Sequence, residues 1–248
     1  MFEPRLALAS LSGEADAAWA AAGADLAGAA FIGGIALDEP SRGAAQKLTE
    51  RDRREFLPAD PLAFIDEQLS ALDDVPIRAG VNIRTTTVEP VREAATICAD
   101  YGAILEINAH CRQSELCAVG CGETLLADSD RLTTYVEAAA AEGPAVCVKV
   151  RTEVPSVDLP VVAQQIERTG ADIIHVDAMD SEQILKEVDE NTDLFIIANN
   201  EVRDRQSVQE YLGYGADAVS VGRPSRDPDG PVMKRVANAV SAWEVPIR

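Results

Sequence analysis

The order of apolar and polar residues predicts strands that alternate with helices along the whole chain. Short aliphatic or β-branched runs are separated by longer segments in which apolar residues recur at helical spacing. We expect eight strands, near Arg5–Ser10, Leu26–Ile32, Ile77–Ile83, Ile104–Asn108, Ala145–Val150, Ile173–Asp177, Leu194–Ala198 and Ala218–Val221. Helical periodicity lies between them, for example over Val88–Tyr101, Asp130–Glu142, Leu159–Thr169 and Gln206–Tyr214.

The character of these strands and their flanking glycines predicts an α/β fold, a (β/α)8 barrel that forms one domain over residues 1–248. Continuously apolar strands suit a parallel sheet that is buried on both faces. A glycine ends the helix before several strands, at Gly23, Gly102, Gly170 and Gly215. An open doubly wound sheet is the alternative, but no G-x-G-x-x-G follows the first strand, which weighs against its dinucleotide-binding form.

Composition narrows the class of protein without naming a function. The chain has 248 residues, of which 47% are hydrophobic, so it can bury a sizeable core. No apolar run approaches the roughly 20 residues of a membrane span. The N-terminus lacks the pattern of a signal peptide, so we expect a cytoplasmic protein with no membrane partner. Five cysteines favour free thiols over a disulfide framework.

The net charge of −20 comes from 42 acidic and 22 basic residues, and the lysines are Lys47, Lys149, Lys186 and Lys234. An acid-rich, lysine-poor composition is typical of proteins adapted to high salt, where the acidic surface serves solvation. An acidic surface evolved for a basic partner is the alternative. A negative field ordinarily weighs against nucleic acid, because affinity for phosphates depends on Lys and Arg.

Two connections are longer than barrel closure requires, Ala36–Asp60 and Ala109–Ala127. Both follow strands and so belong to the C-terminal face, where barrel enzymes hold their active sites. The second contains Cys111 between His110 and Arg112. Neighbouring positive charge and polar partners activate a thiol, so Cys111 is a candidate proton donor or nucleophile, with an ordinary loop cysteine as the alternative.

The other cysteines give weaker signals. Cys111, Cys117 and Cys121 follow a spacing that matches no common zinc or iron–sulfur pattern, so we predict no metal site. Cys98 falls in a predicted helix and Cys147 in a predicted strand, where both are expected to be core residues.

Polar residues also stand at the ends of later strands. Lys149 interrupts an apolar strand, which is costly unless its ammonium reaches an anion at the barrel mouth. His175 and Asp177 end the next strand as site residues or as satisfied polar groups. Asn199-Asn200-Glu201 and Gly222-Arg223 follow the seventh and eighth strands, where many barrels bind phosphate.

Taken together, these residues resemble the dihydrouridine synthases, FMN-dependent barrel enzymes that reduce uridine in tRNA. The resemblance spans almost the whole chain in order. Ser10-Leu11-Ser12-Gly13-Glu14-Ala15-Asp16 is similar to the first-strand motif that contacts the flavin, and Asn82 stands in place of a flavin-contacting glutamine. Ile107-Asn108-Ala109-His110-Cys111 is similar to the motif that carries the catalytic cysteine, and Lys149, Asn199-Asn200-Glu201 and Gly222-Arg223 match the lysine and the two phosphate-site motifs.

Several positions depart from the family. His110 and Arg112 replace a glycine and a proline. Counted from Gly170, Asp177 occupies the place of the family's sixth-strand histidine, and His175 comes two residues earlier. The chain ends one helix beyond the eighth strand. We therefore expect a short, divergent, archaeal-type member without the C-terminal helical domain that helps the family grip tRNA.

The resemblance implies that NADPH or NADH reduces FMN, that hydride passes to the C5=C6 bond of uridine, and that Cys111 supplies the proton. Cys111 and Lys149 would be catalytic, and Asn108, His110 and Arg112 would bind substrate. The cofactor would be bound by Ser10, Leu11, Ser12, Asn82, Lys149, His175, Asp177, Asn199, Asn200, Glu201, Gly222 and Arg223. The alternatives are an FMN-dependent reductase of a small pyrimidine or enone, a non-redox isomerase or lyase that binds a phosphorylated metabolite, and a protein that binds flavin without chemistry.

Overall fold

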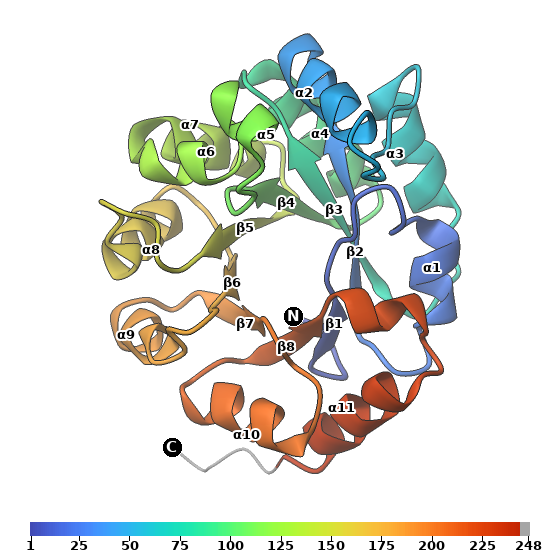
Figure 1. Ribbon diagram of the computed structural model, residues 1–248, viewed down its shortest axis with the longest axis vertical. Coiled ribbons are helices and arrows are strands. Elements are labelled where there is room, and N and C mark those ends of the chain that lie inside the picture. Colours follow the sequence, from blue (N-terminus) through green and yellow to red (C-terminus); the bar gives the residue numbers. More distant parts are fainter. Residues whose placement is uncertain (244–248) are drawn as a thin grey trace.

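Eight parallel strands close into a barrel in sequence order, with the helices outside it (Figure 1). The computed structural model describes residues 1–243. The (β/α)8 prediction is confirmed, and the open sheet is excluded because β1 pairs with β8 as well as with β2. The strands are β1 (Leu6–Leu8), β2 (Ala29–Ala36), β3 (Arg78–Arg84), β4 (Ile104–Asn108), β5 (Ala145–Arg151), β6 (Ile173–Asp177), β7 (Phe195–Asn199) and β8 (Ala218–Val221).

The helices of the outer layer are amphipathic and often begin at an aspartate. A side-chain oxygen of Asp16, Asp38, Asp60, Asp128, Asp158 or Asp204 accepts a backbone N–H of the first turn, which stabilises the helix start. The helices are α1 (Ala17–Ala22), α2 (Glu39–Thr49), α3 (Pro61–Ser70), α4 (Glu89–Asp100), α5 (Ser114–Ala118), α6 (Glu123–Ala127), α7 (Ser129–Ala140), α8 (Leu159–Arg168), α9 (Ile184–Asn191), α10 (Arg205–Gly213), the 3₁₀ turn η1 (Arg223–Arg226) and α11 (Pro231–Ser241).

The structure corrects three local predictions. Strand β2 lies later than Leu26–Ile32, because pairing with β3 continues past Gly33 through an irregularity between Gly33 and Ile35. The connection 36–60 contains α2, and the connection 109–127 contains α5 and α6. Gly23 ends its helix at φ −95°, whereas Gly102, Gly170 and Gly215 take the positive φ expected after a helix.

The barrel interior is layered. Near the N-terminal end of the strands, apolar side chains that include Phe2, Phe31 and Ile104 fill it. Side chains alternate between the two faces of a strand. The next inward positions are therefore Asn82, Glu106, Lys149, His175 and Ser220, all at most 2% exposed. A polar layer thus lies directly beneath the C-terminal mouth.

None of the helices within residues 1–243 combines the length and apolar character that crossing a bilayer requires.

Candidate active site

A cleft of about 830 Å³ opens at the C-terminal end of the barrel. Such a volume is within the range of sites that bind nucleotide-sized ligands. Eight residues predicted from the sequence line it: Ser10, Leu11, Ser12, Asn108, His110, Cys111, Arg112 and Arg223. The predicted first-strand, fourth-strand and eighth-strand motifs therefore meet at one site.

The lining of this cleft is strongly basic although the chain has a net charge of −20. Glu14 and Asp52 are the acidic lining residues, against six arginines, Arg53, Arg54, Arg84, Arg112, Arg223 and Arg226. Glu14 holds Arg226 with two contacts of 2.7 Å, and Glu55 holds Arg84 at 2.6 Å. No ion pair within the described part of the chain involves Arg53, Arg112 or Arg223, so these cations are available to an anionic ligand.

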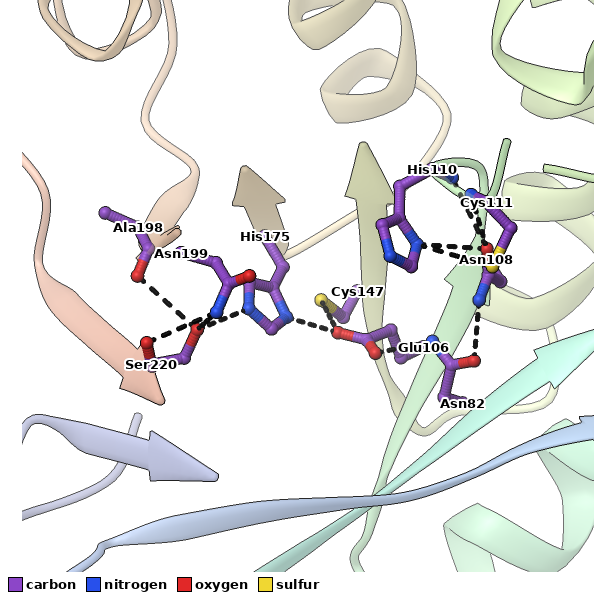
Figure 2. Close-up of polar contacts among 10 residues, drawn as sticks. All are labelled: Asn82, Glu106, Asn108, His110, Cys111, Cys147, His175, Ala198, Asn199 and Ser220. Atoms are coloured by element: carbon purple, nitrogen blue, oxygen red, sulfur yellow. Dashed lines mark hydrogen bonds and ion pairs between the residues drawn. The ribbon is translucent and has the colours of Figure 1, made fainter. Parts of the chain in front are cut away.

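Cys111 lies just beyond the end of β4 and is 6% exposed. Asn108 Oδ1 accepts hydrogen bonds from the backbone N–H groups of His110 at 3.4 Å and Cys111 at 3.2 Å. The His110 ring turns back over this turn, with Nδ1 3.1 Å from Asn108 Oδ1 and 3.9 Å from Cys111 Sγ (Figure 2). The thiol is therefore held beside an imidazole at the edge of the cleft.

A tight backbone approach fixes the other side of Cys111. Its carbonyl accepts a hydrogen bond from the backbone N–H of Glu123 at 2.8 Å. Gly122 has φ +63°, and a Cβ built on it would lie 2.0 Å from the Cys111 carbonyl oxygen. Only glycine fits there, so the segment between α5 and α6 determines how the Cys111 turn is presented.

The thiols of the two other loop cysteines, Cys117 and Cys121, hydrogen-bond to the backbone around this turn. The Cys117 thiol donates to the Cys111 carbonyl, and the Cys121 thiol donates to the Thr85 carbonyl, each at 3.5 Å. Burial raises the pKa of Cys121 to about 12, so its thiol stays protonated at neutral pH.

A continuous chain of hydrogen bonds crosses the polar layer (Figure 2). Asn108 Nδ2 donates to Asn82 Oδ1 at 2.8 Å, and Asn82 Nδ2 donates to Glu106 Oε1 at 2.6 Å. The other carboxylate oxygen of Glu106 lies 2.6 Å from His175 Nδ1 and 3.5 Å from Cys147 Sγ. The far end of the chain is Ser220 Oγ, which lies 2.7 Å from His175 Nε2 and accepts from Asn199 Nδ2 at 2.7 Å.

The charges around Glu106 and His175 determine where the protons lie in this series of hydrogen bonds. Burial opposes charge on Glu106, but His175 and Lys149 outweigh it and lower the carboxyl pKa, so Glu106 is ionised. Burial and Lys149 lower the pKa of His175 to about 4, so the ring is neutral at pH 7. His175 Nδ1–H then donates to Glu106, and Nε2 accepts the Ser220 hydroxyl proton. This arrangement of three metal-type donors, Glu106, Cys147 and His175, is thus accounted for by hydrogen bonds.

Lys149 completes the layer. It is 2% exposed, and its ammonium forms no hydrogen bond or ion pair with any residue among 1–243, although it interacts electrostatically with Glu106. A buried ammonium without a direct partner is costly, and an electron-rich or anionic group above it would offset that cost.

The remaining predicted motifs lie at the ends of β7 and β8. Asn200 and Glu201 adopt φ +105° and +48°, a region that favours glycine, and the Tyr211 hydroxyl donates to the Asn200 carbonyl at 2.9 Å. A Cβ on Gly222 would meet open space, and Arg223 follows it. The open space at Gly222, the cation of Arg223 and the unpaired Lys149 fit FMN, whose phosphate needs N–H groups and a cation and whose ring gains negative charge on reduction.

The remaining predicted residues lie at different depths. Asp177 and Asn199 are partly exposed at the ends of β6 and β7, and Glu201 is exposed. His175 is fully buried with both ring nitrogens bound to protein, so it faces the polar layer and not the cleft.

Four residues in or beneath the site were not predicted from the sequence: Arg84, Glu55, Glu106 and Ser220. Arg84 is 4% exposed and lines the cleft, and it also donates to the Ser12 hydroxyl. Burial opposes its charge, but Cys111 and Glu55 raise the pKa of its guanidinium. Glu106 could have been noticed on the same ground as Lys149, as a charge within an apolar strand.

The chain is thus an eight-stranded α/β barrel with a basic cleft and a cysteine at its C-terminal mouth. A sequence model of the dihydrouridine synthase (Dus) family matches residues 66–238, and the chain belongs to this family. Membership supports a flavin-dependent oxidoreductase as the general class of enzyme.

Individual comparisons agree with the barrel fold. An uncharacterized protein of Methanocaldococcus jannaschii is 27% identical over 232 residues, covering 89% of each chain. DHODH from Eimeria tenella has a similar fold, with a TM-score of 0.71 and 16% identity over 95% of this chain and 83% of that chain. FabK from Thermotoga maritima gives a TM-score of 0.60 and 16% identity over 89% of this chain, which spans 58% of the length of FabK.

Proposed function

We propose that this protein is an FMN-dependent reductase that adds two hydrogens across the C5=C6 bond of uridine in RNA, with tRNA as the substrate. The observation that carries the proposal is the presentation of Cys111. Its thiol lies beside the His110 ring at the edge of a cleft lined by six arginines, and its backbone N–H donates to Asn108.

Each residue of the site would have its own role in the reaction. FMN, when bound and reduced, would supply hydride to one carbon of the uracil double bond. Cys111 would donate its S–H proton to the other carbon and become a thiolate, and the nearby Arg84 guanidinium would stabilise that negative charge. Lys149 would stabilise negative charge on the flavin, while Gly222, Arg223 and Asn200 would hold its phosphate.

The substrate would be recognised by charge at the mouth. Arg53 and Arg112 are exposed and lack ion-pair partners in the described chain, so they suit the phosphates that flank a uridine. A uridine in structured RNA would have to be turned out of its stack to reach Cys111. A nicotinamide dinucleotide, NADPH or NADH, would supply the hydride equivalent that regenerates reduced flavin.

The test is direct. Purified protein with FMN and NADPH is incubated with tRNA that lacks dihydrouridine, and the nucleosides are measured by mass spectrometry. We expect dihydrouridine to form, and Cys111→Ala to slow its formation by about 100-fold or more. Cys98→Ala, which removes a buried thiol from α4, is the matched control and should retain activity.

Two results would contradict the proposal. Reduction of free uracil or another small enone with no reaction on tRNA would favour a small-molecule substrate. Full activity of Cys111→Ala would remove the assigned proton donor.

A further inference from the structure

We propose that Glu106, which lies beneath the cleft and does not line it, is a positioning residue: its carboxylate fixes the orientation of the Asn82 and Asn108 amides and through them the His110–Cys111 turn. This inference rests on the proposed function, in which Cys111 is the proton donor.

The direction of every bond follows from one charge. An ionised carboxylate can only accept hydrogen bonds, so Asn82 must turn its NH₂ group toward Glu106 Oε1, 2.6 Å away. Its carbonyl oxygen then faces Asn108, which must donate its own NH₂ group at 2.8 Å. That leaves Asn108 Oδ1 pointing at the backbone N–H groups of His110 and Cys111.

The orientation of the Asn108 amide also fixes the tautomer of His110, whose ring lies next to the thiol. Because Asn108 Oδ1 is an acceptor, the proton of neutral His110 belongs on Nδ1, the nitrogen 3.1 Å from that oxygen and 3.9 Å from Cys111 Sγ. If Asn108 were reversed, its NH₂ group would oppose two backbone N–H groups, and the turn would lose its anchor.

Glu106 is the charged acceptor at the base of an arm of hydrogen bonds, in which Asn108 donates to Asn82 and Asn82 donates to Glu106. Asn82, Asn108 and Glu106 are 0%, 2% and 0% exposed, so water does not replace a lost partner. On its other side Glu106 is held by His175 Nδ1 and interacts with Lys149, which keeps the carboxylate ionised. Through Asn82 on β3 and Asn108 on β4, the buried carboxylate of Glu106 thus orients the Cys111 turn at the barrel mouth.

The experiment measures how fast iodoacetamide alkylates Cys111 in protein without added flavin, with peptide mass spectrometry to separate the five cysteines. Glu106→Met removes the acceptor at nearly constant volume. Loss of the hydrogen bond from Asn82 to Glu106 should release the turn and raise the Cys111 alkylation rate about tenfold. Asn82→Ser breaks the same arm while Glu106 keeps its bond to His175, so it is less liable to unfold the protein and should give the same rise.

Two controls distinguish positioning by Glu106 from a nonspecific increase in flexibility of the protein. Cys147→Ala removes another contact of Glu106, at 3.5 Å, that is not part of the arm, and should leave the Cys111 rate unchanged. The double variant Asn82→Ser/Glu106→Met should match the single variants, because both break one chain. Asn82→Ser, Glu106→Met and the double variant should also lower kcat for uridine reduction with little change in KM.

The inference is overturned if Asn82→Ser and folded Glu106→Met both alkylate at the wild-type rate, or if their effects multiply in the double variant. Retention of uridine reduction by Cys111→Ala would instead contradict the proposed function, and the alkylation result would stand independently of it.

Discussion

Arg84 and Glu55 form a buried ion pair that ties β3 to the long connection after β2. Arg84 Nη1 lies 2.6 Å from Glu55 Oε2, and the two side chains are 3% and 1% exposed. The arginine also reaches Ser12, so the pair joins three segments that line the cleft. The connection 36–60 is therefore anchored at its cleft-facing end.

Removal of Glu55 is expected to destabilise the protein. Glu55→Ala leaves a buried guanidinium without a counter-ion, which costs about 3–5 kcal/mol. Urea unfolding measures this loss. The control is Lys186→Ala in the exposed Lys186–Glu190 pair, whose side chains are 65% and 59% exposed, where no measurable change is expected. Equal midpoints for Glu55→Ala and the wild type would show that the pair does not stabilise the fold.

Mild acid is expected to destabilise the fold through the histidines. Burial and neighbouring cations lower the pKa of His110 and bring the pKa of His175 to about 4, whereas an unfolded histidine titrates near 6.5. The unfolded state therefore binds more protons between about pH 6.5 and 4, and the free energy of unfolding must fall as pH falls through that window.

The chain has two histidines, so each can be removed in turn. His110→Asn and His175→Asn should each reduce the slope of unfolding free energy against pH by up to about 1.4 kcal/mol per pH unit. The slopes come from urea titrations at several pH values between about 5 and 6.5. A slope that survives both substitutions would assign acid sensitivity to other groups.

The substitution Gly222→Ala is expected to weaken cofactor binding without affecting folding. A Cβ at this position meets no protein atom, and the residue has φ −88°, so Gly222→Ala should fold normally. If the phosphate of FMN approaches this backbone closely, the added methyl should weaken FMN binding about tenfold, as measured by fluorescence quenching. Gly213→Ala, a helical glycine with open space around its Cβ, is the control. Unchanged FMN affinity in Gly222→Ala would move the phosphate elsewhere.

The acidic surface is expected to make the protein salt-dependent. With 42 acidic and 22 basic residues, self-repulsion should be relieved as KCl screens it, so the melting temperature should rise between about 0.1 and 2 M KCl. A melting temperature that is flat or falls over this range would contradict the prediction of adaptation to high salt.

The strands and their order could be predicted because apolar runs and glycines are local signals. The runs at Ile104–Asn108, Ile173–Asp177 and Ala218–Val221 match β4, β6 and β8 at both ends. The polar layer could not be predicted in this way. Glu106 contacts His175, 69 positions away, and His175 contacts Ser220, 45 positions away, so only the closed barrel brings them together. The buried pair of Arg84 and Glu55 depends likewise on how the connection 36–60 folds back.

The most direct test is the absorbance of the purified protein near about 450 nm, followed under anaerobic conditions. We expect a bound flavin band that bleaches when NADPH is added and returns when tRNA lacking dihydrouridine is added. Protein that fails to bind FMN, or a bleached band that tRNA does not restore, would contradict the assignment of this protein as an FMN-dependent reductase of uridine in RNA.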